Sequence, residues 1–229
     1  MTTTHPTVLL IGASRGLGLA LAQEYLARGA HVVATVRGSR PTPLHDLTDP
    51  NLEIEHVDIT ERAQVESLRD RLKDRAFDLL FVVAGITNGR YETPADVDPD
   101  EFSQVMTTNA LSPMRTVELL RDLVRADGTI AVMSSGQGSI ANNERGEFEI
   151  YRASKSALNQ LMRSYAARHR DDPRTLLLAA PGWVRTELGG PDAVLTVEES
   201  IPRLAGVIDA QHGRGGLQFL DYRGETLPW

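Results

Sequence analysis

The stretch TVLLIGASRGLG, Thr7–Gly18, decides the fold. Its first half, Thr7–Ile11, is a short apolar run rich in residues that favour β-strands. Three glycines follow, and from Leu17 to Arg28 the apolar residues recur with helical spacing until Gly29, a typical residue for ending a helix. The pattern therefore predicts a strand, a glycine-rich turn and a helix, in that order.

The same alternation of strand and helix continues to the end of the chain. Consecutive strands joined by helices form βαβ units, so we expect a single α/β domain over residues 1–229, with a doubly wound parallel sheet and helices on both faces. A Thr196–Glu199 capping box and a cap at Thr60 are expected for two of the helices. The predicted strands are Thr7–Ile11, His31–Val36, Leu52–Val57, Phe77–Val83, Thr129–Met133, Thr175–Ala179 and Leu217–Leu220. The predicted helices are Leu17–Arg28, Thr60–Asp74, Asp100–Arg125, Glu149–Met162 and Val197–Ala210.

Composition excludes several classes of protein. The formal net charge of −7 argues against nucleic acid as the main partner, and the absence of cysteine excludes thiol catalysis and disulfides. The six histidines have no spacing typical of a metal site, so no metal is expected. No apolar run is long enough to cross a bilayer, and the N-terminal MTTTHPT lacks a signal-peptide pattern, so we expect a cytoplasmic protein.

The glycine turn predicts nucleotide binding. Glycine permits tight turns and a close approach of phosphate to the backbone, and the N-terminus of a helix offers free N–H groups and a positive dipole end. The second strand ends at Val36–Arg37 without the carboxylate that would bind the ribose of NAD. Arg37 and Arg15 are instead suited to a 2′-phosphate, which predicts NADP(H) in preference to NAD(H).

A Tyr and a Lys lie one turn apart on the predicted helix Glu149–Met162, on the side that carries Leu158 and Met162. An ammonium beside Tyr151 favours the phenolate, so we expect Lys155 to lower the pKa of Tyr151 and to fit it for proton transfer. Another helix carries Asn109 on its apolar side, four residues before Pro113. Because proline has no N–H to donate, we expect a kink that leaves the Asn109 carbonyl free.

Taken together, GASRGLG, Asn109, MSSGQG (Met133–Gly138), Tyr151-x-x-x-Lys155 and PGWVRTEL (Pro181–Leu188) resemble the short-chain dehydrogenase/reductase family. The chain end, Gly216–Trp229, is similar to that of the compact C-factor- and sniffer-like carbonyl reductase branch. The resemblance implies a Rossmann sheet of about seven strands in the order 3-2-1-4-5-6-7. The sequence departs from the family at Ile11, where a threonine usually stands, and at Val82 and Val83, which replace two asparagines.

The resemblance also implies roles for individual residues. Asn109, Ser135, Tyr151 and Lys155 correspond to the catalytic residues; the family pattern favours Ser135 over the neighbouring Ser134. The interval from Ser135 to Tyr151 is longer than usual, and its polar NNERGE stretch (residues 142–147) is expected to form a loop near the site. The cofactor-binding residues are expected to be Gly12, Ser14, Arg15, Gly16, Leu17, Gly18, Arg37, Asp58, Ile59, Ala84, Gly85, Asn109, Tyr151, Lys155, Pro181, Gly182, Val184 and Thr186.

The resulting hypothesis is an NADP(H)-dependent oxidoreductase that transfers hydride between the nicotinamide and a small ketone, aldehyde or secondary alcohol. One alternative is a cofactor-binding sensor or signalling protein of the C-factor type with little turnover. A less favoured alternative is an epimerase or dehydratase. The family usually pairs its long helix and its tyrosine helix across a two-fold axis, so a homodimer or homotetramer is expected.

Overall fold

The computed structural model of the protein describes residues 5–229. Residues 1–4, which belong to the segment without a signal-peptide pattern, lie outside the described residues. Seven strands form one parallel sheet in the order β3-β2-β1-β4-β5-β6-β7, which confirms the predicted fold class and strand order. The strands are β1 (Thr7–Ile11), β2 (His31–Val36), β3 (Leu52–His56), β4 (Phe77–Val82), β5 (Val124–Met133), β6 (Thr175–Ala180) and β7 (Gly216–Asp221).

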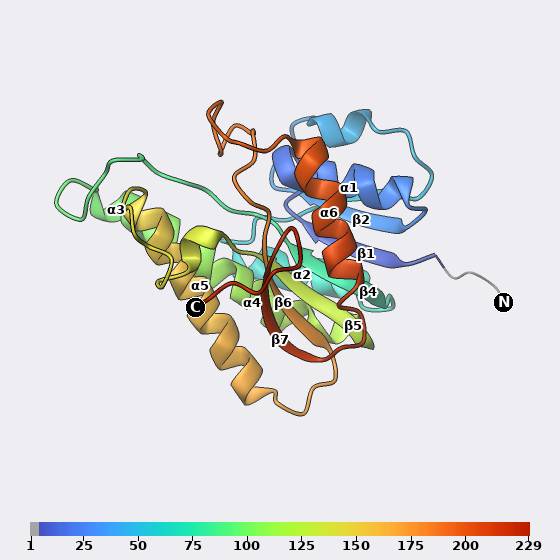
Figure 1. The fold of residues 1–229 in the computed structure, drawn as a ribbon. Coiled ribbons are helices and arrows are strands. Elements are labelled where there is room, and N and C mark those ends of the chain that lie inside the picture. Colours follow the sequence, from blue (N-terminus) through green and yellow to red (C-terminus); the bar gives the residue numbers. More distant parts are fainter. Residues whose placement is uncertain (1–4) are drawn as a thin grey trace.

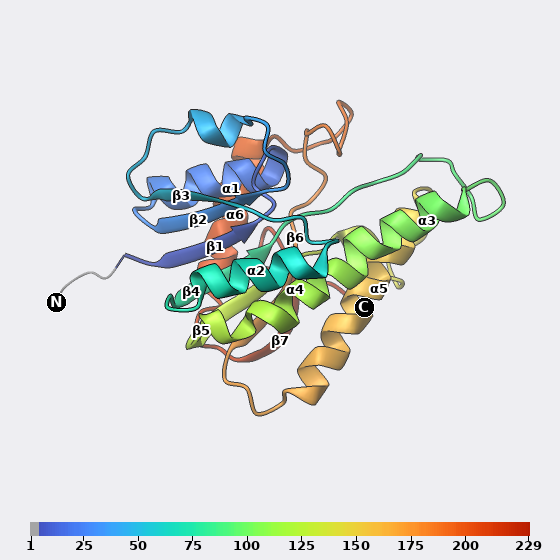
Figure 2. The ribbon, with the colours of Figure 1, turned by 180° about the vertical axis from the view of Figure 1, so that it is seen from behind.

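Helices cover both faces of this sheet. Helices α1 and α6 lie over one face (Figure 1), and α2, α4 and α5 lie over the other, as the view from behind shows (Figure 2). The helices are α1 (Gly16–Ala27), α2 (Arg62–Leu72), α3 (Pro99–Met106), α4 (Ser112–Leu120), α5 (Glu149–Arg168) and α6 (Val197–Asp209). Four short turns complete the list: η1 (Pro43–Asp46), the π-helical η2 (Thr107–Leu111), η3 (Arg121–Leu123) and η4 (Gly136–Gly138).

The alternation of side chains along each strand divides the core in two. In β1, Leu9 and Ile11 pack with α2, α4 and α5, whereas Val8 and Leu10 pack with α1 and α6. Successive residues of a strand point to opposite faces, so a strand that is covered on both sides must be apolar throughout. This explains why the central strands read as continuous apolar runs.

One helix prediction was wrong at its end, and another helix is longer than the predicted stretch. The helix expected to reach Arg125 stops earlier, because Val124 already pairs with Phe77 of β4 and starts β5. Helix α5 continues past Met162 to Arg168. The Thr60 cap was also wrong, since the hydroxyl of Thr60 donates to Asp58 Oδ1 and Glu61 occupies the cap position of α2.

Two local predictions are confirmed. Thr196 and Glu199 form the expected capping box of α6, with N–H to side-chain oxygen distances of 2.8 and 3.1 Å. The kink expected before Pro113 takes the form of the π-helical turn η2, which carries Asn109. Pro113 cannot donate to the Asn109 carbonyl, and a wider turn accommodates the missing hydrogen bond.

Gly18 supplies a test of how closely α1 approaches the sheet. A Cβ on this residue would lie 2.0 Å from the carbonyl oxygen of Gly12, within the backbone of the turn. We expect Gly18→Ala to lower the free energy of unfolding by roughly 1–3 kcal/mol or more, because backbone cannot move aside without cost. Denaturant unfolding measures the change.

Gly206 is the matched control, since it lies in α6 and a Cβ there would meet nothing within 4 Å. Gly206→Ala should raise the free energy of unfolding by about 0.5–1 kcal/mol, because alanine favours the helix. Equal unfolding midpoints for the two variants would contradict the packing argument.

Candidate active site

The carboxyl ends of the parallel strands meet at one edge of the sheet, and the strand order changes direction between β1 and β4 at this edge. Ligands of doubly wound folds bind at such a point. Every segment predicted to bind the cofactor or to react follows one of these strand ends or lies on a helix that begins here. The topology therefore gathers the predicted residues into one region.

The turn after β1 has a conformation that requires glycine, and it is hydrogen-bonded to β2. Gly12 has a φ of +93°, and a Cβ there would lie 2.8 Å from the Cβ of Ala84. The Gly12 N–H donates to Thr35 Oγ1 at 2.9 Å, and the Ala13 N–H donates to the Thr35 carbonyl at 2.7 Å. Thr35 of β2 thus supplies a hydroxyl that the turn lacks at Ile11. Sequence reasoning missed it, because Thr35 lies inside a strand.

The sequence departures at Val82 and Val83 leave the sheet supported. Val82 is buried and pairs with Ile11 and Val132 of the neighbouring strands. The N–H groups of Val83 and Ala84 both donate to the carbonyl of Ile11, at 2.9 and 3.1 Å. Apolar packing and backbone hydrogen bonds therefore hold the end of β4, without the two asparagine side chains that are usual in the family.

The start of α1 leaves backbone N–H groups without a side-chain cap, an arrangement typical of anion-binding helix ends. Arg15 occupies the cap position and its side chain forms no capping hydrogen bond, so the first N–H groups of the helix lack a side-chain cap. Ser14 and Leu17 are partly buried beside this turn, and Gly16 has a φ of +56°. A Cβ on Gly85 would approach both Asn109 Oδ1 and Lys155 Nζ at 3.4 Å, so the missing side chain keeps space open beside these groups.

The residues expected at the adenosine end follow β1, β2 and β3, which are neighbours in the sheet. Arg37 is exposed and takes part in no ion pair within residues 5–229. Arg15 forms an exposed ion pair with Glu187, which a phosphate can replace because exposed pairs contribute little stability. Asp58 Oδ1 accepts from Thr60 N–H and Oγ–H, and Ile59 is buried in the core.

Asn109 is the centre of a buried polar network. Its amide donates to the Ile86 carbonyl at 2.8 Å and to Ser154 Oγ at 3.0 Å, while its Oδ1 accepts from the Ile86 N–H at 2.8 Å. Ser154 Oγ in turn donates to the Tyr151 carbonyl at 2.7 Å. Asn109 therefore joins the end of β4 to the first turn of α5, a link that Ser154 completes and that the sequence did not indicate.

The two serines after β5 have different surroundings. Ser134 is buried, and its hydroxyl donates to Asn159 Oδ1 at 2.6 Å. Ser135 is partly exposed, its Oγ accepts from the Gln137 N–H at 3.1 Å, and it lies near enough to Tyr151 to lower the pKa of that phenol. Ser135 is thus the serine that reaches Tyr151, whereas Ser134 and Asn159 fix the strand end to α5. Asn159, 25 residues from Ser134, was missed because only the fold brings the two together.

Tyr151 and Lys155 lie side by side on α5, with Lys155 Nζ 5.7 Å from the centre of the Tyr151 ring. Lys155 is only 3% exposed, and its Nζ donates to the Met133 carbonyl at 2.9 Å. Burial raises the pKa of Tyr151 to about 12, against a smaller lowering by the neighbouring Ser135, and burial lowers the pKa of Lys155 to about 8.

The expectation that Lys155 lowers the pKa of Tyr151 was therefore wrong for the protein without a ligand. Desolvation disfavours the charged form of both groups, and it outweighs their mutual influence. Tyr151 consequently keeps its proton at neutral pH, the state in which a phenol can donate it.

The segment Pro181–Thr186, which follows β6, contributes the last group of predicted site residues. Pro181 is buried and its carbonyl accepts from Ser200 Oγ–H at 2.7 Å, while Gly182 has a φ of +82° and no room for a Cβ beside Leu195. Val184 forms a β-bridge with Leu195, which makes Thr186–Val194 a short closed loop. Thr186 lies next to Gly16, since a Cβ on that glycine would approach Thr186 Cγ2 at 4.0 Å.

Two observations limit the kinds of site. Among residues 5–229, the His, Asp and Glu side chains form no group of three or more that is suited to a metal ion. In that same part of the chain, no helix combines the length and the apolar character needed to cross a membrane.

The fold and the site define a Rossmann protein with a glycine-rich turn after β1 and a polar cluster of Asn109, Ser135, Tyr151 and Lys155 at the edge of the sheet. The sequence model of the short chain dehydrogenase family matches residues 6–193. The chain therefore belongs to this family of oxidoreductases.

Known relatives agree with this membership. A short-chain dehydrogenase/reductase from Burkholderia multivorans, crystallised with bound NADP, is 56% identical, with a TM-score of 0.97 over 99% of this chain and 100% of that one. The carbonyl reductase Sniffer of D. melanogaster is 28% identical, with a TM-score of 0.88 over 99% of this chain and 100% of that one. The C-signal protein of Myxococcus xanthus is 35% identical over 66% of this chain and 92% of its own length.

The burial of Lys155 predicts a pH-dependent gain in stability for Lys155→Met in the protein without cofactor. The pKa of this lysine is about 8 when folded and 10.5 in the reference state, so below pH 8 the folded protein carries the full cost of a buried charge. We expect the variant to be more stable than the wild type at pH 7, by on the order of 1–3 kcal/mol. The difference should shrink as the pH rises toward 10.5, where the folded wild type has lost that proton.

Unfolding midpoints at pH 7 and pH 10 measure this difference. Lys73→Met is the control, because Lys73 is exposed at the end of α2 and its replacement should have no such pH-dependent effect. A Lys155→Met protein less stable than wild type at pH 7 would show that the hydrogen bond to Met133 outweighs desolvation.

Proposed function

We propose that the protein is an NADP(H)-dependent carbonyl reductase, which reduces a small ketone or aldehyde to an alcohol and can catalyse the reverse oxidation. The observation that carries the proposal is the position of the buried Lys155, with its Nζ 5.7 Å from the centre of the Tyr151 ring and hydrogen-bonded to the Met133 carbonyl, close to Ser135. The NADP bound to the Burkholderia relative and the carbonyl reductase activity in the name of Sniffer support it.

In the proposed reaction, NADPH, when bound, supplies the hydride that forms the new C–H bond at the carbonyl carbon. Tyr151 donates its phenolic proton to the carbonyl oxygen, which becomes the alcohol hydroxyl. Ser135 donates a hydrogen bond to the same oxygen and holds it within reach of Tyr151. A high pKa for Tyr151 suits reduction, because the group is protonated before the reaction begins.

Lys155 and Asn109 support this step in different ways. The ammonium of Lys155 would stabilise the phenolate left on Tyr151 after proton transfer and would hold the ribose hydroxyls of a bound cofactor. Asn109 fixes the first turn of α5 through Ser154, and its carbonyl, which Pro113 cannot bond, is available to hold a water that returns a proton.

The cofactor would lie along the residues expected from the sequence. The turn of Gly12, Gly16 and Gly18 would bind the pyrophosphate at the start of α1, where the amides lack a side-chain cap. Arg37 and Arg15 would bind the 2′-phosphate, Asp58 and Ile59 would lie near the adenine, and the segment from Pro181 to Thr186 would meet the nicotinamide. Ala84 and Gly85 would let the cofactor lie against the backbone.

A second candidate function is a cofactor-binding signalling protein with little turnover. The 35% identity with a protein named C-signal favours keeping it. A screen of NADPH oxidation with ketones, aldehydes and quinones separates the two functions. NADPH binding without turnover of any carbonyl would favour the signalling function over the reductase.

We also propose that two copies pair through α5 and through the end of α3 with η2, which belong to the segment that the sequence predicted as one long helix. A groove of about 370 Å³ on this side is lined by Met106, Thr107, Ala110, Leu111, Ala157, Gln160 and Leu161. Leu111 and Leu161 are 47% and 41% exposed there, an apolar surface that a second copy would cover. Sedimentation should give a dimer or a tetramer, and a monomer at micromolar concentration would contradict this arrangement.

Tyr151→Phe removes the proton donor and leaves the ring in place. We expect kcat to fall by roughly 10²–10⁴-fold, the usual contribution of a positioned acid, while NADPH still binds. Fluorescence titration gives the binding and NADPH oxidation gives kcat. Tyr165→Phe is the matched control: it lies on the same helix, is buried, and its hydroxyl has no hydrogen-bond partner within the described chain.

Activity retained in Tyr151→Phe, or lost equally in Tyr165→Phe, would exclude Tyr151 as the proton donor.

Arg37→Ala tests the preference for NADPH. A charge-assisted hydrogen bond to the 2′-phosphate is worth about 1.5–3 kcal/mol, so the ratio of kcat/KM for NADPH to that for NADH should fall by about 10–100-fold. Arg40→Ala, an exposed arginine in the same segment, should leave the ratio unchanged. A wild-type protein as efficient with NADH as with NADPH would refute the preference itself.

A further inference from the structure

The backbone directly before α5 has an unusual conformation. Glu147 and Phe148 have φ values of +54° and +50°, the only positive ones among non-glycine residues in the described chain, and Phe148 is the cap residue of α5. The left-handed region is costly for residues that carry a Cβ, and two such residues in succession are rare. Contacts from elsewhere must hold them there.

Arg90, in the loop between β4 and α3, makes those contacts. The Phe148 N–H donates to the Arg90 carbonyl at 2.7 Å. The Arg90 guanidinium donates from Nε and Nη2 to Glu147 Oε2 at 3.1 and 2.9 Å, and its Cζ lies 5.6 Å from the centre of the Phe148 ring. One residue therefore binds both strained positions through backbone, charge and ring.

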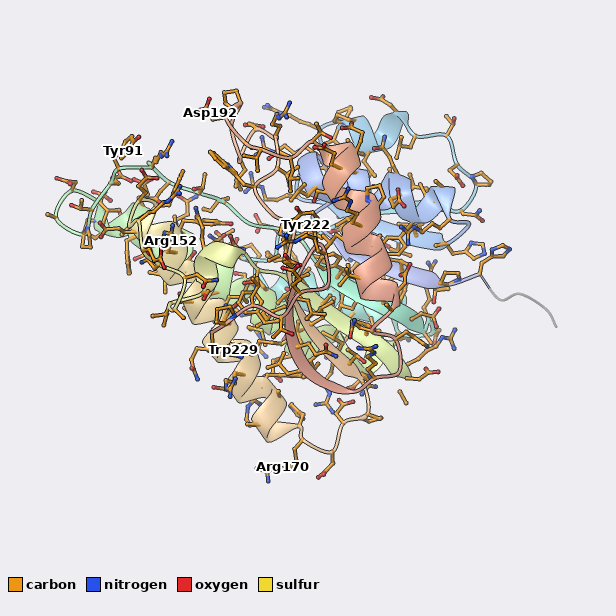
Figure 3. The ribbon with its side chains drawn as sticks, viewed as in Figure 1. Tyr91, Arg152, Arg170, Asp192, Tyr222 and Trp229 are labelled. Atoms are coloured by element: carbon orange, nitrogen blue, oxygen red, sulfur yellow. The ribbon has the colours of Figure 1, made fainter. Side chains whose placement is uncertain are left out.

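The same two positions hold the first turn of α5. The carbonyl of Phe148 accepts from the Arg152 N–H at 2.8 Å, and the carbonyl of Glu147 accepts from Arg152 Nε at 2.9 Å. Tyr151 lies in this turn, next to Arg152. Figure 3 shows Arg152 near the beginning of α5, with Tyr91, the neighbour of Arg90, at the same end of the molecule.

We propose that Arg90 is a positioning residue for the reaction: by holding Glu147 and Phe148, it fixes where Tyr151 lies relative to Ser135. The inference rests on the proposed function. It assigns a purpose to the longer interval between Ser135 and Tyr151, whose polar stretch ends at Glu147 and supplies the carboxylate that Arg90 binds.

A purely stabilising role would have a different signature. The side chains of Arg90 and Glu147 are 39% and 34% exposed, and ion pairs of this kind contribute little to global stability. Turnover, in contrast, depends steeply on the distance between proton donor and carbonyl oxygen. Loss of Arg90 should consequently reduce kcat far more than it lowers the unfolding midpoint.

The test compares Arg90→Ala, Arg90→Lys and Glu147→Gln with the wild type, using the intact protein, NADPH and a ketone that the wild type reduces. Arg90→Ala should lower kcat about tenfold or more, because a displacement on the order of 1 Å is sufficient for such a loss. NADPH affinity should stay within about twofold, since the Arg90 side chain contacts Glu147, Tyr91 and Phe148, none of which is a predicted cofactor residue. Arg90→Lys keeps one charged donor and should recover part of kcat.

Arg62→Ala is the matched control, because it breaks an exposed ion pair with Glu66 on α2, away from α5. It should leave kcat unchanged. The double variant Arg90→Ala/Glu147→Gln should be no slower than the slower single variant, since both remove the same contact. An unchanged kcat in Arg90→Ala, or a loss that lysine does not partly restore, would overturn the proposal.

Hydrogen exchange separates failure of this proposal from failure of the proposed function. The Phe148 amide should exchange faster in Arg90→Ala than in the wild type or Arg62→Ala, with or without any turnover. Equal exchange would show that Arg90 does not hold the segment and would overturn the inference. A wild type that reduces no carbonyl would overturn the proposed function and with it the kinetic role, while faster exchange would still identify Arg90 as the anchor of Phe148.

Discussion

The close contact between the first turn and the backbone around it is the constraint on which the rest of the structure depends. A Cβ on Gly18 would overlap the carbonyl oxygen of Gly12, and one on Gly12 would overlap Ala84. Without side chains at these two positions, α1 can begin directly at the end of β1 and point its first amides at the place where the strand order reverses. The packing of α1 against α6 and the position of the β4 end follow from the same contact.

Beside this turn, polar groups are buried only where they have partners. Asn109, Ser134 and Ser154 lie in the interior, and each makes a hydrogen bond that ties α5 to the sheet or to the turn around Asn109. Lys155 differs, because a single carbonyl is its hydrogen-bond acceptor and its charge is left without an opposite charge in an ion pair within residues 5–229. The chain thus tolerates an unfavourable group at the position where the proposed chemistry needs a cation, a common compromise between stability and activity.

Most of the fold could be predicted from the sequence, because strand and helix signals are local and the parallel order follows from alternation. The end of the helix before β5 could not, since the pairing of Val124 with Phe77 is a contact between distant residues. The site also combines features with a local sequence signal and features that depend on contacts between distant residues. Its strand ends and its Tyr–Lys spacing are visible in the sequence, whereas the pKa of Tyr151 depends on burial that only the folded chain defines. Arg90 and Glu147, 57 residues apart, carry no local signal that they meet.

Thr35 supplies, from the neighbouring strand, the hydroxyl that binds the turn after β1. The family pattern places a hydroxyl at the residue before the first glycine, and here that residue is the buried Ile11. Parallel neighbours deliver their side chains to the same edge of a sheet, so β2 can supply the hydroxyl that β1 does not. What the turn requires is an acceptor at a point in space, and the chain is free to provide it from either strand. The family motif, which specifies a threonine at the end of β1, therefore reports a missing hydroxyl in this protein. Thr35 of β2 provides that hydroxyl instead.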